Sequence, residues 1–156
     1  MQNTPTGTTA LEALVAHYAA MPPVAALQPQ VMQWRNGHLQ LSAPLAANVN
    51  DKGCAFGGSL ASLMTLAAWG LVFLELSTQG VEADIFVADS RVRYLKPVFE
   101  DLFIDAGFDD AAEPAALVDT LRLQGRASIR LRASTGLQAG GIAATFVGRY
   151  VAIRRQ

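Results

Sequence analysis

The residues of this sequence best suited to chemistry lie in one loop, residues 50–59, which reads NDKGCAFGGS. Gly57 and Gly58 stand where a long apolar segment begins, and a helix starting there leaves its first backbone amides without partners inside the helix. Such amides stabilise the oxyanion that develops during acyl transfer, and glycine lets a substrate carbonyl approach the backbone. We therefore expect both glycines to act as oxyanion donors. The alternative is that they only allow tight packing of the helix against a sheet.

The nearest carboxylate to this helix start is that of Asp51, six residues before Gly57. Hydrolysis of an acyl compound needs a group that activates or orients water. Asp51 is therefore our leading candidate for a general base, and Asn50 is a candidate for a hydrogen bond to the acyl substrate or to the water. For both residues the alternative is a role in a turn, in which the side chain bonds to its own backbone.

Four further side chains near the motif are expected to line the site. Ser62 and Thr65 lie one and two turns into the predicted helix, on the face of Gly58, where either hydroxyl could orient water or contact an acyl group. Their alternative is a hydrogen bond to the carbonyl group of the preceding turn. Phe56 and Ser59 flank the two glycines, and we expect them to contact the substrate.

A second group of polar side chains lies on a strand predicted around residues 85–95. Asp89, Arg91 and Arg93 fall on one face of this strand and Ser90 falls on the other, because side chains alternate along a strand. The arginines, with Lys96, could bind the phosphate groups of a ligand or an acidic partner protein, and Asp89 and Ser90 are substrate-binding candidates beside them. The alternative is a solvated sheet face, or pairing of the arginines with Asp89.

Length, charge and cysteine content narrow the class of protein. The chain has 156 residues, of which 51% are hydrophobic, which suits one buried core and is too few for two ordinary domains. Its formal net charge of −1 argues against binding to nucleic acid or to an anionic membrane. Cys54, the only cysteine, stands apart in sequence from His17 and His38, so we expect a buried thiol and no metal site. No basic segment precedes the first apolar stretch, and we expect a cytoplasmic protein.

These candidates depend on the elements that must position them. The pattern first predicts a helix at 9–21, behind a threonine cap and ended by two prolines, and then hairpin strands at 31–34 and 38–41 around an Asn-Gly turn. An irregular segment at 44–56 leads into a long helix from 57 to 80. Strands follow at 85–98 and 102–108, then a helix at 114–124 ended by a glycine, and two last strands at 127–133 and through 146–153.

The long helix decides between a membrane protein and a soluble one. Residues 57–76 are almost wholly apolar, with Glu75 as the single charge, and they are long enough to span a bilayer. However, small and hydroxylated residues fill the first half, and no aromatic belt or basic cluster flanks the segment. We therefore expect a buried central helix that a mainly antiparallel sheet wraps.

This order of elements resembles the hotdog superfamily, in which a curved sheet wraps a central helix. The residues that carry the resemblance are NVNDKGCAFGGSLASLMTLAAWGLVFLEL and the later DIFVADSRVRYLKPV. The spacing of Asn50, Gly53, Gly57 and Gly58 is similar to the asparagine-glycine-histidine-glycine-glycine signature of thioesterases of the phenylacetate-degradation type. NDKGCAFGGSL and VADS more closely resemble the thioesterase domain that also forms the C-terminal part of YiiD-type acetyltransferases.

The resemblance implies a fold, an activity and an assembly. It implies a single α+β hotdog domain over residues 1–156, with residues 1–30 as an N-terminal helical extension. The implied activity is hydrolysis, by an activated water, of an acyl thioester carried by coenzyme A or by an acyl carrier protein. The implied cofactor list is empty apart from coenzyme A as part of the substrate. The implied assembly is a homodimer or a dimer of dimers, with no nucleic-acid or membrane partner.

Two departures from the family pattern keep other functions open. Phe56 stands where the signature has histidine, and Thr65 stands where many of these thioesterases carry an acidic residue on the helix. A non-catalytic module that binds or senses acyl-CoA fits these departures. A hotdog dehydratase or hydratase would need a histidine converging on the substrate, and neither His17 nor His38 is near the motif in sequence.

Overall fold

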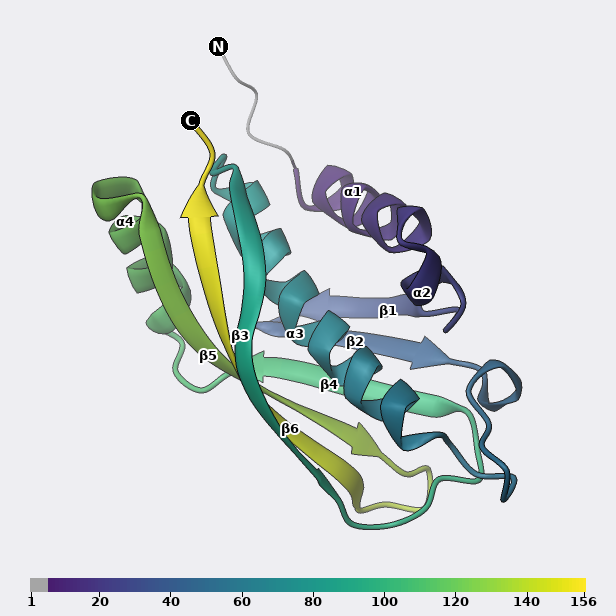
Figure 1. Ribbon diagram of the computed structural model, residues 1–156. Helices are drawn as coiled ribbons and strands as arrows, with labels where there is room; N and C mark the ends of the chain where they lie inside the picture. Colours follow the sequence, from purple (N-terminus) through teal and green to yellow (C-terminus); the bar gives the residue numbers. More distant parts are fainter. Residues whose placement is uncertain (1–5) are drawn as a thin grey trace.

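The computed structural model describes residues 6–156, so the first five residues of the predicted N-terminal extension lie outside the described part. The elements follow in the order α1 (Gly7–Ala20), α2 (Pro22–Ala25), β1 (Gln30–Arg35), β2 (His38–Ala43), a 3-10 turn η1 (Leu45–Ala47), α3 (Gly57–Thr78), β3 (Ala83–Tyr94), β4 (Leu102–Phe108), α4 (Glu113–Gln124), β5 (Arg126–Gly136) and β6 (Ile142–Arg154). The strands form one sheet in the order β1-β2-β4-β5-β6-β3, and every neighbouring pair is antiparallel (Figure 1).

Helix α3 lies across one face of the sheet, and helix α1 packs against α3 (Figure 1). Tyr18 of α1 donates its hydroxyl to the Leu66 carbonyl of α3 at 2.6 Å. A side chain at Gly70 would collide with Tyr18 and come within 2.8 Å of Leu39, so glycine is what lets α1 and β2 approach the helix. The helix has a mean hydropathy of 1.7 in a window that is 61% buried, and it is a core helix although its length and composition would suit a membrane span. The predicted central helix is confirmed.

Short-range signals located the turns correctly. Asn36 and Gly37 join β1 to β2 with φ values of 53° and 73°, the left-handed pair that a two-residue hairpin turn requires. Helix α4 ends at Gly125, which has a φ of 73° and donates its amide to the Leu121 carbonyl. Strand β5 alternates buried and exposed residues as predicted.

The first helix starts earlier than predicted. Helix α1 begins at Gly7, because Thr6 rather than a later threonine is its N-cap and accepts a hydrogen bond from the Thr9 amide at 3.4 Å. Helix α1 ends at Ala20, before the two prolines, as predicted. Pro22 then starts the short helix α2 from a first-turn position, where the missing amide hydrogen costs nothing.

Strand β3 is the outermost strand on one side of the sheet and pairs only with β6. It ends at Tyr94, earlier than predicted, and Val98 instead accepts a hydrogen bond from the Ala55 amide of the loop before α3. The pairing with β6 shifts between Val87 and Asp89, where the strand contains a β-bulge. Within residues 6–156 no strand covers the outer edge of β3. The Ile85 carbonyl accepts from the Trp69 indole nitrogen at 3.0 Å, and the other outward backbone groups are available to pair.

Candidate functional site

The start of α3 presents two free backbone amides. Its N-cap residue is Phe56, which has no side-chain group that can accept a hydrogen bond. The Phe56 carbonyl accepts from the amides of Ser59 at 3.0 Å and Leu60 at 3.1 Å. The amides of Gly57 and Gly58 have no acceptor within residues 6–156. They are donors at the positive end of the helix dipole, as the sequence predicted.

Aromatic rings stand where side chains would lie on both glycines. A Cβ on Gly57 would lie 3.4 Å from the Tyr94 ring. A Cβ on Gly58 would lie 2.8 Å from one atom of the Phe56 ring and even closer to a second atom of that ring. Tyr94 also donates its hydroxyl to the Gly57 carbonyl at 2.9 Å. Both rings are 56% exposed, so they form walls of an open surface site rather than a closed core. Close packing therefore also contributes to the need for glycine here.

Asn50 is occupied by its own loop. Its side-chain oxygen accepts from the backbone amides of Lys52 at 2.8 Å and Cys54 at 3.2 Å, and its nitrogen lies 3.2 Å from the Cys54 sulfur. These contacts are those of the turn role that was the alternative for this residue. Cys54 is only 8% exposed, in keeping with the expected buried thiol.

Asp51, the predicted base, lies on the surface. Its side chain is 81% exposed and pairs with the Lys52 ammonium at 2.9 Å. Within the described residues it makes no hydrogen bond to the start of α3. The structure thus places Asp51 in the same loop as the free amides without joining it to them.

The other residues of the motif are divided between solvent and core. The Thr65 hydroxyl donates to the Ala61 carbonyl at 2.7 Å, which is the bond to the preceding turn that was its alternative. Ser62 is exposed, whereas Ser59 is only 5% exposed. Phe56 is the predicted substrate contact that lies directly against the glycine pair.

The polar residues of β3 lie away from the free amides of their own chain. Asp89 pairs with Arg149 at 2.8 Å, so it does not neutralise the neighbouring arginines. Arg91 and Arg93 line a groove of about 520 Å³ with Arg132 on the face of the sheet opposite α3, and within residues 6–156 neither forms an ion pair. Ser90 is exposed on the α3 side.

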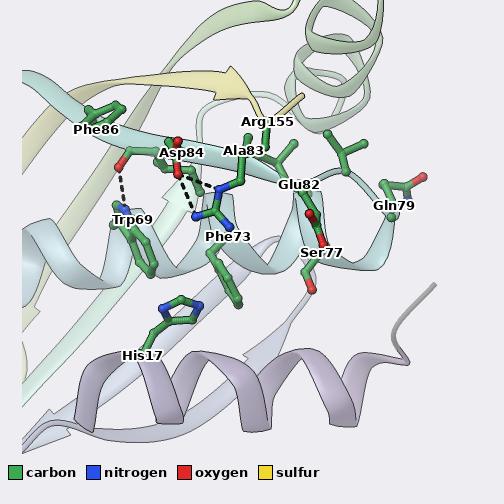
Figure 2. A pocket seen from close by; sticks show the side chains of 14 residues that line it. His17, Trp69, Phe73, Ser77, Gln79, Glu82, Ala83, Asp84, Phe86 and Arg155 are labelled. Carbon is green, nitrogen blue, oxygen red and sulfur yellow. Dashed lines mark hydrogen bonds and ion pairs between the residues drawn. The ribbon is translucent and has the colours of Figure 1, made fainter. Parts of the chain in front are cut away.

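A pocket of about 740 Å³ that the sequence did not predict lies at the other end of α3. Figure 2 shows Trp69 and Phe73 side by side on α3, with His17 facing them from α1. The ring centroids of Trp69 and Phe73 are 5.5 Å apart and those of His17 and Phe73 are 4.9 Å apart. The ion pair between Asp84 and Arg155, at 2.7 Å, lies on the β3 side. The two α3 aromatics, four positions apart, were the available signal, but an apolar helix carries many such pairs.

The chain is similar to known proteins over nearly its whole length. A family model described as "Putative thioesterase (yiiD_Cterm)" matches residues 11–154. A structure of a putative thioesterase from Shewanella oneidensis is 30% identical, with a TM-score of 0.82 over 92% of this chain and 97% of that one. A protein of unknown function from Chlorobaculum tepidum is 24% identical, with a TM-score of 0.89 over 97% of this chain and 99% of that one.

The PaaI protein of the E. coli phenylacetic acid degradation operon shares the fold, with 17% identity and a TM-score of 0.68 over 97% of each chain. The sheet and its central helix are those of hotdog-fold thioesterases, so the predicted fold is confirmed. Because the family model covers the sheet, the central helix and the glycine pair together, the chain belongs to the YiiD C-terminal family of thioesterases.

Proposed function

We propose that this protein hydrolyses an acyl thioester of coenzyme A or of an acyl carrier protein. The observation that carries the proposal is the pair of free amides of Gly57 and Gly58 at the uncapped start of α3. The thioester carbonyl oxygen lies at these donors, and water adds to the carbonyl carbon. The negative charge that develops on the oxygen is stabilised by the two amides until the carbon–sulfur bond breaks. The thiolate leaves and takes up a proton, and the acyl group leaves as the carboxylate.

We assign activation of the water to Asp51. It is the only carboxylate in residues 44–58. Its one ion pair, with Lys52, lies on the surface, and exposed pairs of this kind hold their partners weakly. A bound substrate can therefore draw the carboxylate away from Lys52 toward the attacking water.

A non-catalytic module that binds acyl-CoA is the second candidate function. It is favoured by two observations: Phe56 lies over Gly58 at the histidine position of the signature, and the Thr65 hydroxyl is bonded within its own helix. Neither histidine adds a catalytic group at the helix start, because His38 bonds to Asp105 and His17 lies against Phe73.

The deciding experiment measures release of free thiol from a panel of acyl-CoA and acyl-carrier substrates, with calorimetric binding of the same compounds. Thiol release that saturates with substrate supports the hydrolase. Saturable binding without thiol release supports the binding module. Absence of both results contradicts either function.

We further propose that a second copy of the chain pairs with the free edge of β3. Large apolar side chains are exposed along this strand, with Phe86 at 55%, Val87 at 44% and Tyr94 at 56%. An antiparallel pair centred on Ser90 sets Asp89 opposite Arg91 of the partner subunit. A centre on Asp89 would oppose two carboxylates, and a centre on Arg91 would oppose two guanidinium groups. Charge complementarity therefore favours Ser90 as the two-fold centre.

The same register pairs apolar residues on the α3 face. The bulge before Asp89 adds one residue to β3, so it shifts by one the pairing of the residues that precede it. Ile85 then lies opposite Tyr94 of the partner subunit, and the two side chains point to the same face of the sheet. Ile85 lines the aromatic pocket, and Tyr94 contacts the start of α3. The pairing thus supports a site in which the amides of one subunit face the aromatic pocket of the other. Within one subunit, Trp69 is about 18 Å from Gly57 along the helix, at about 1.5 Å per residue.

Disulfide trapping tests this register. Opposite residues in an antiparallel pair have Cα atoms about 4.5–5.5 Å apart, within the range that a disulfide spans. In a Cys54→Ala background, Ser90→Cys should give a covalent dimer on mild oxidation. Ser128→Cys, at an exposed position of β5, is the matched control and should stay monomeric on a denaturing gel. A monomer for both variants, with a monomeric parent in solution, contradicts the pairing.

A further inference from the structure

All three tyrosines of the chain donate their hydroxyls to backbone carbonyls of α3. Tyr18 donates to Leu66 at 2.6 Å, Tyr150 to Thr65 at 2.6 Å and Tyr94 to Gly57 at 2.9 Å. Burial explains the first two bonds. Tyr18 is 3% exposed and Tyr150 is fully buried, and a buried hydroxyl without an acceptor is costly. Within one subunit Tyr94 is 56% exposed, so water could satisfy its hydroxyl and burial within the subunit does not explain its bond.

The acceptor of Tyr94 belongs to the peptide group that carries a catalytic donor. The carbonyl of Gly57 and the amide of Gly58 are the two ends of one planar peptide unit, and in a trans peptide they point in opposite directions. A donor held at the carbonyl end therefore fixes the direction of the amide at the other end. It also polarises that amide, an effect of about 10–30% per bond in a hydrogen-bonded chain.

The ring of Tyr94 adds a second restraint. It lies 3.4 Å from the position that a Cβ would occupy on Gly57, so it replaces the side chain that this residue lacks. Glycine is the residue with the largest backbone freedom, and an uncapped helix start is the part of a helix that frays most readily. Tyr94 reaches this position from the end of β3, and hence from the sheet rather than from the helix itself.

We propose that Tyr94 is a positioning residue that orients and polarises the Gly58 amide for the developing oxyanion. The inference rests on the proposed function, because it concerns the same pair of amides. An oxyanion-hole donor contributes about 10²–10³-fold to kcat. If Tyr94 strengthens this donor's hydrogen bond by about 10–30%, the same share of the free-energy contribution corresponds to about a two- to eightfold change in kcat. Loss of the hydroxyl should lower kcat by this factor and leave KM unchanged, because the interaction grows with charge in the transition state.

The test compares three matched variants, Tyr94→Phe, Tyr18→Phe and Tyr150→Phe. Each removes one hydroxyl bonded to an α3 carbonyl and keeps the ring. For each we would measure kcat and KM for an acyl-CoA, the melting temperature, and the Gly58 amide by its NMR chemical shift and hydrogen exchange. Tyr94→Phe should lower kcat and shift the Gly58 amide at nearly constant melting temperature. The other two variants should lower the melting temperature without shifting that amide.

Each outcome decides the inference. An unshifted Gly58 amide together with an unchanged kcat in Tyr94→Phe overturns it. A fall in melting temperature as large as that of the buried controls, with kcat and KM changing together, also overturns it, because Tyr94 is then a structural residue. If the parent protein hydrolyses no thioester, the proposed function fails, but the response of the Gly58 amide still shows whether Tyr94 sets its geometry.

Discussion

Replacing Gly58 by alanine separates stability from activity at the start of α3. The new methyl carbon would lie 2.8 Å or less from atoms of the Phe56 ring, which no real Cβ tolerates, so the ring must move. Because Phe56 is 56% exposed and ends in solvent, its side chain can move outward without shifting the backbone. The helix start itself should therefore survive the substitution.

The sign of the stability change follows from the same geometry. Gly58 does not have a positive φ, so alanine fits its backbone, and it restricts the unfolded chain by about 0.4–1 kcal/mol relative to glycine. We expect the free energy of unfolding to stay constant or to rise within this range. Activity should fall, because the methyl group and the displaced ring occupy space in front of the amide. A misplacement of about 1 Å at a reacting centre costs about 10²-fold, which is the loss in kcat/KM that we expect.

The assay combines urea unfolding with steady-state thiol release, and two further variants control it. Gly57→Ala meets the Tyr94 ring at 3.4 Å, an ordinary contact, and should lose much less activity than Gly58→Ala. The double variant Gly58→Ala with Phe56→Ala removes the displaced ring and should recover part of the loss. Full activity in Gly58→Ala would refute the reasoning. So would a destabilisation above about 1 kcal/mol, since the clash would then have reached the backbone.

Three other predictions follow from charged groups. Asp51→Asn should lower kcat by about 10²-fold at constant melting temperature; full turnover would make Asp51 a loop residue only. If Arg91 and Arg93 bind coenzyme A phosphates, replacing both by alanine should raise KM in a salt-dependent way and leave kcat little changed. An unchanged KM would instead indicate that the two arginines belong to a solvated face of the sheet. Burial raises the pKa of Glu75, so folding favours its protonated form and stability falls as pH rises through the folded-state pKa. Glu75→Gln should therefore raise the melting temperature at pH 7–8, with the gain disappearing below the unfolded-state pKa of about 4.3.

The parts of the fold that the sequence predicted correctly are those with local causes. The Asn36-Gly37 turn needs only two residues that accept a positive φ, and helix α3 needs only a continuous apolar run that a sheet can cover. The free amides of Gly57 and Gly58 follow from the same logic. An uncapped helix start exposes its first amides whatever the rest of the fold does.

The parts that could not be predicted have causes that are distant in sequence. The contact between Tyr94 and Gly57 joins residues 37 positions apart, and it depends on where β3 ends beside α3. The aromatic pocket likewise needs His17 from α1 to meet Phe73 of α3. Asp51 shows the converse limit: its proximity in sequence to the helix start did not reveal that the local turn formed by Asn50 places its side chain on the surface, paired with Lys52. Its catalytic role stays a prediction.

The choice of phenylalanine at the N-cap of α3 unites these observations. A serine, threonine, asparagine or aspartate there would accept a hydrogen bond from the second or third amide of the helix, and its replacement by an apolar residue typically costs about 1 kcal/mol. In α3 the second amide is that of Gly58, so a capping side chain would occupy a proposed oxyanion donor. Phe56 leaves that donor free and covers the glycine with an apolar ring. The helix tolerates the missing cap because its stability comes from burial, with Leu63, Leu71 and Leu74 completely inaccessible to solvent. The hydrophobic run that resembles a membrane span therefore stabilises a helix whose first two amides stay free, as the proposed function requires.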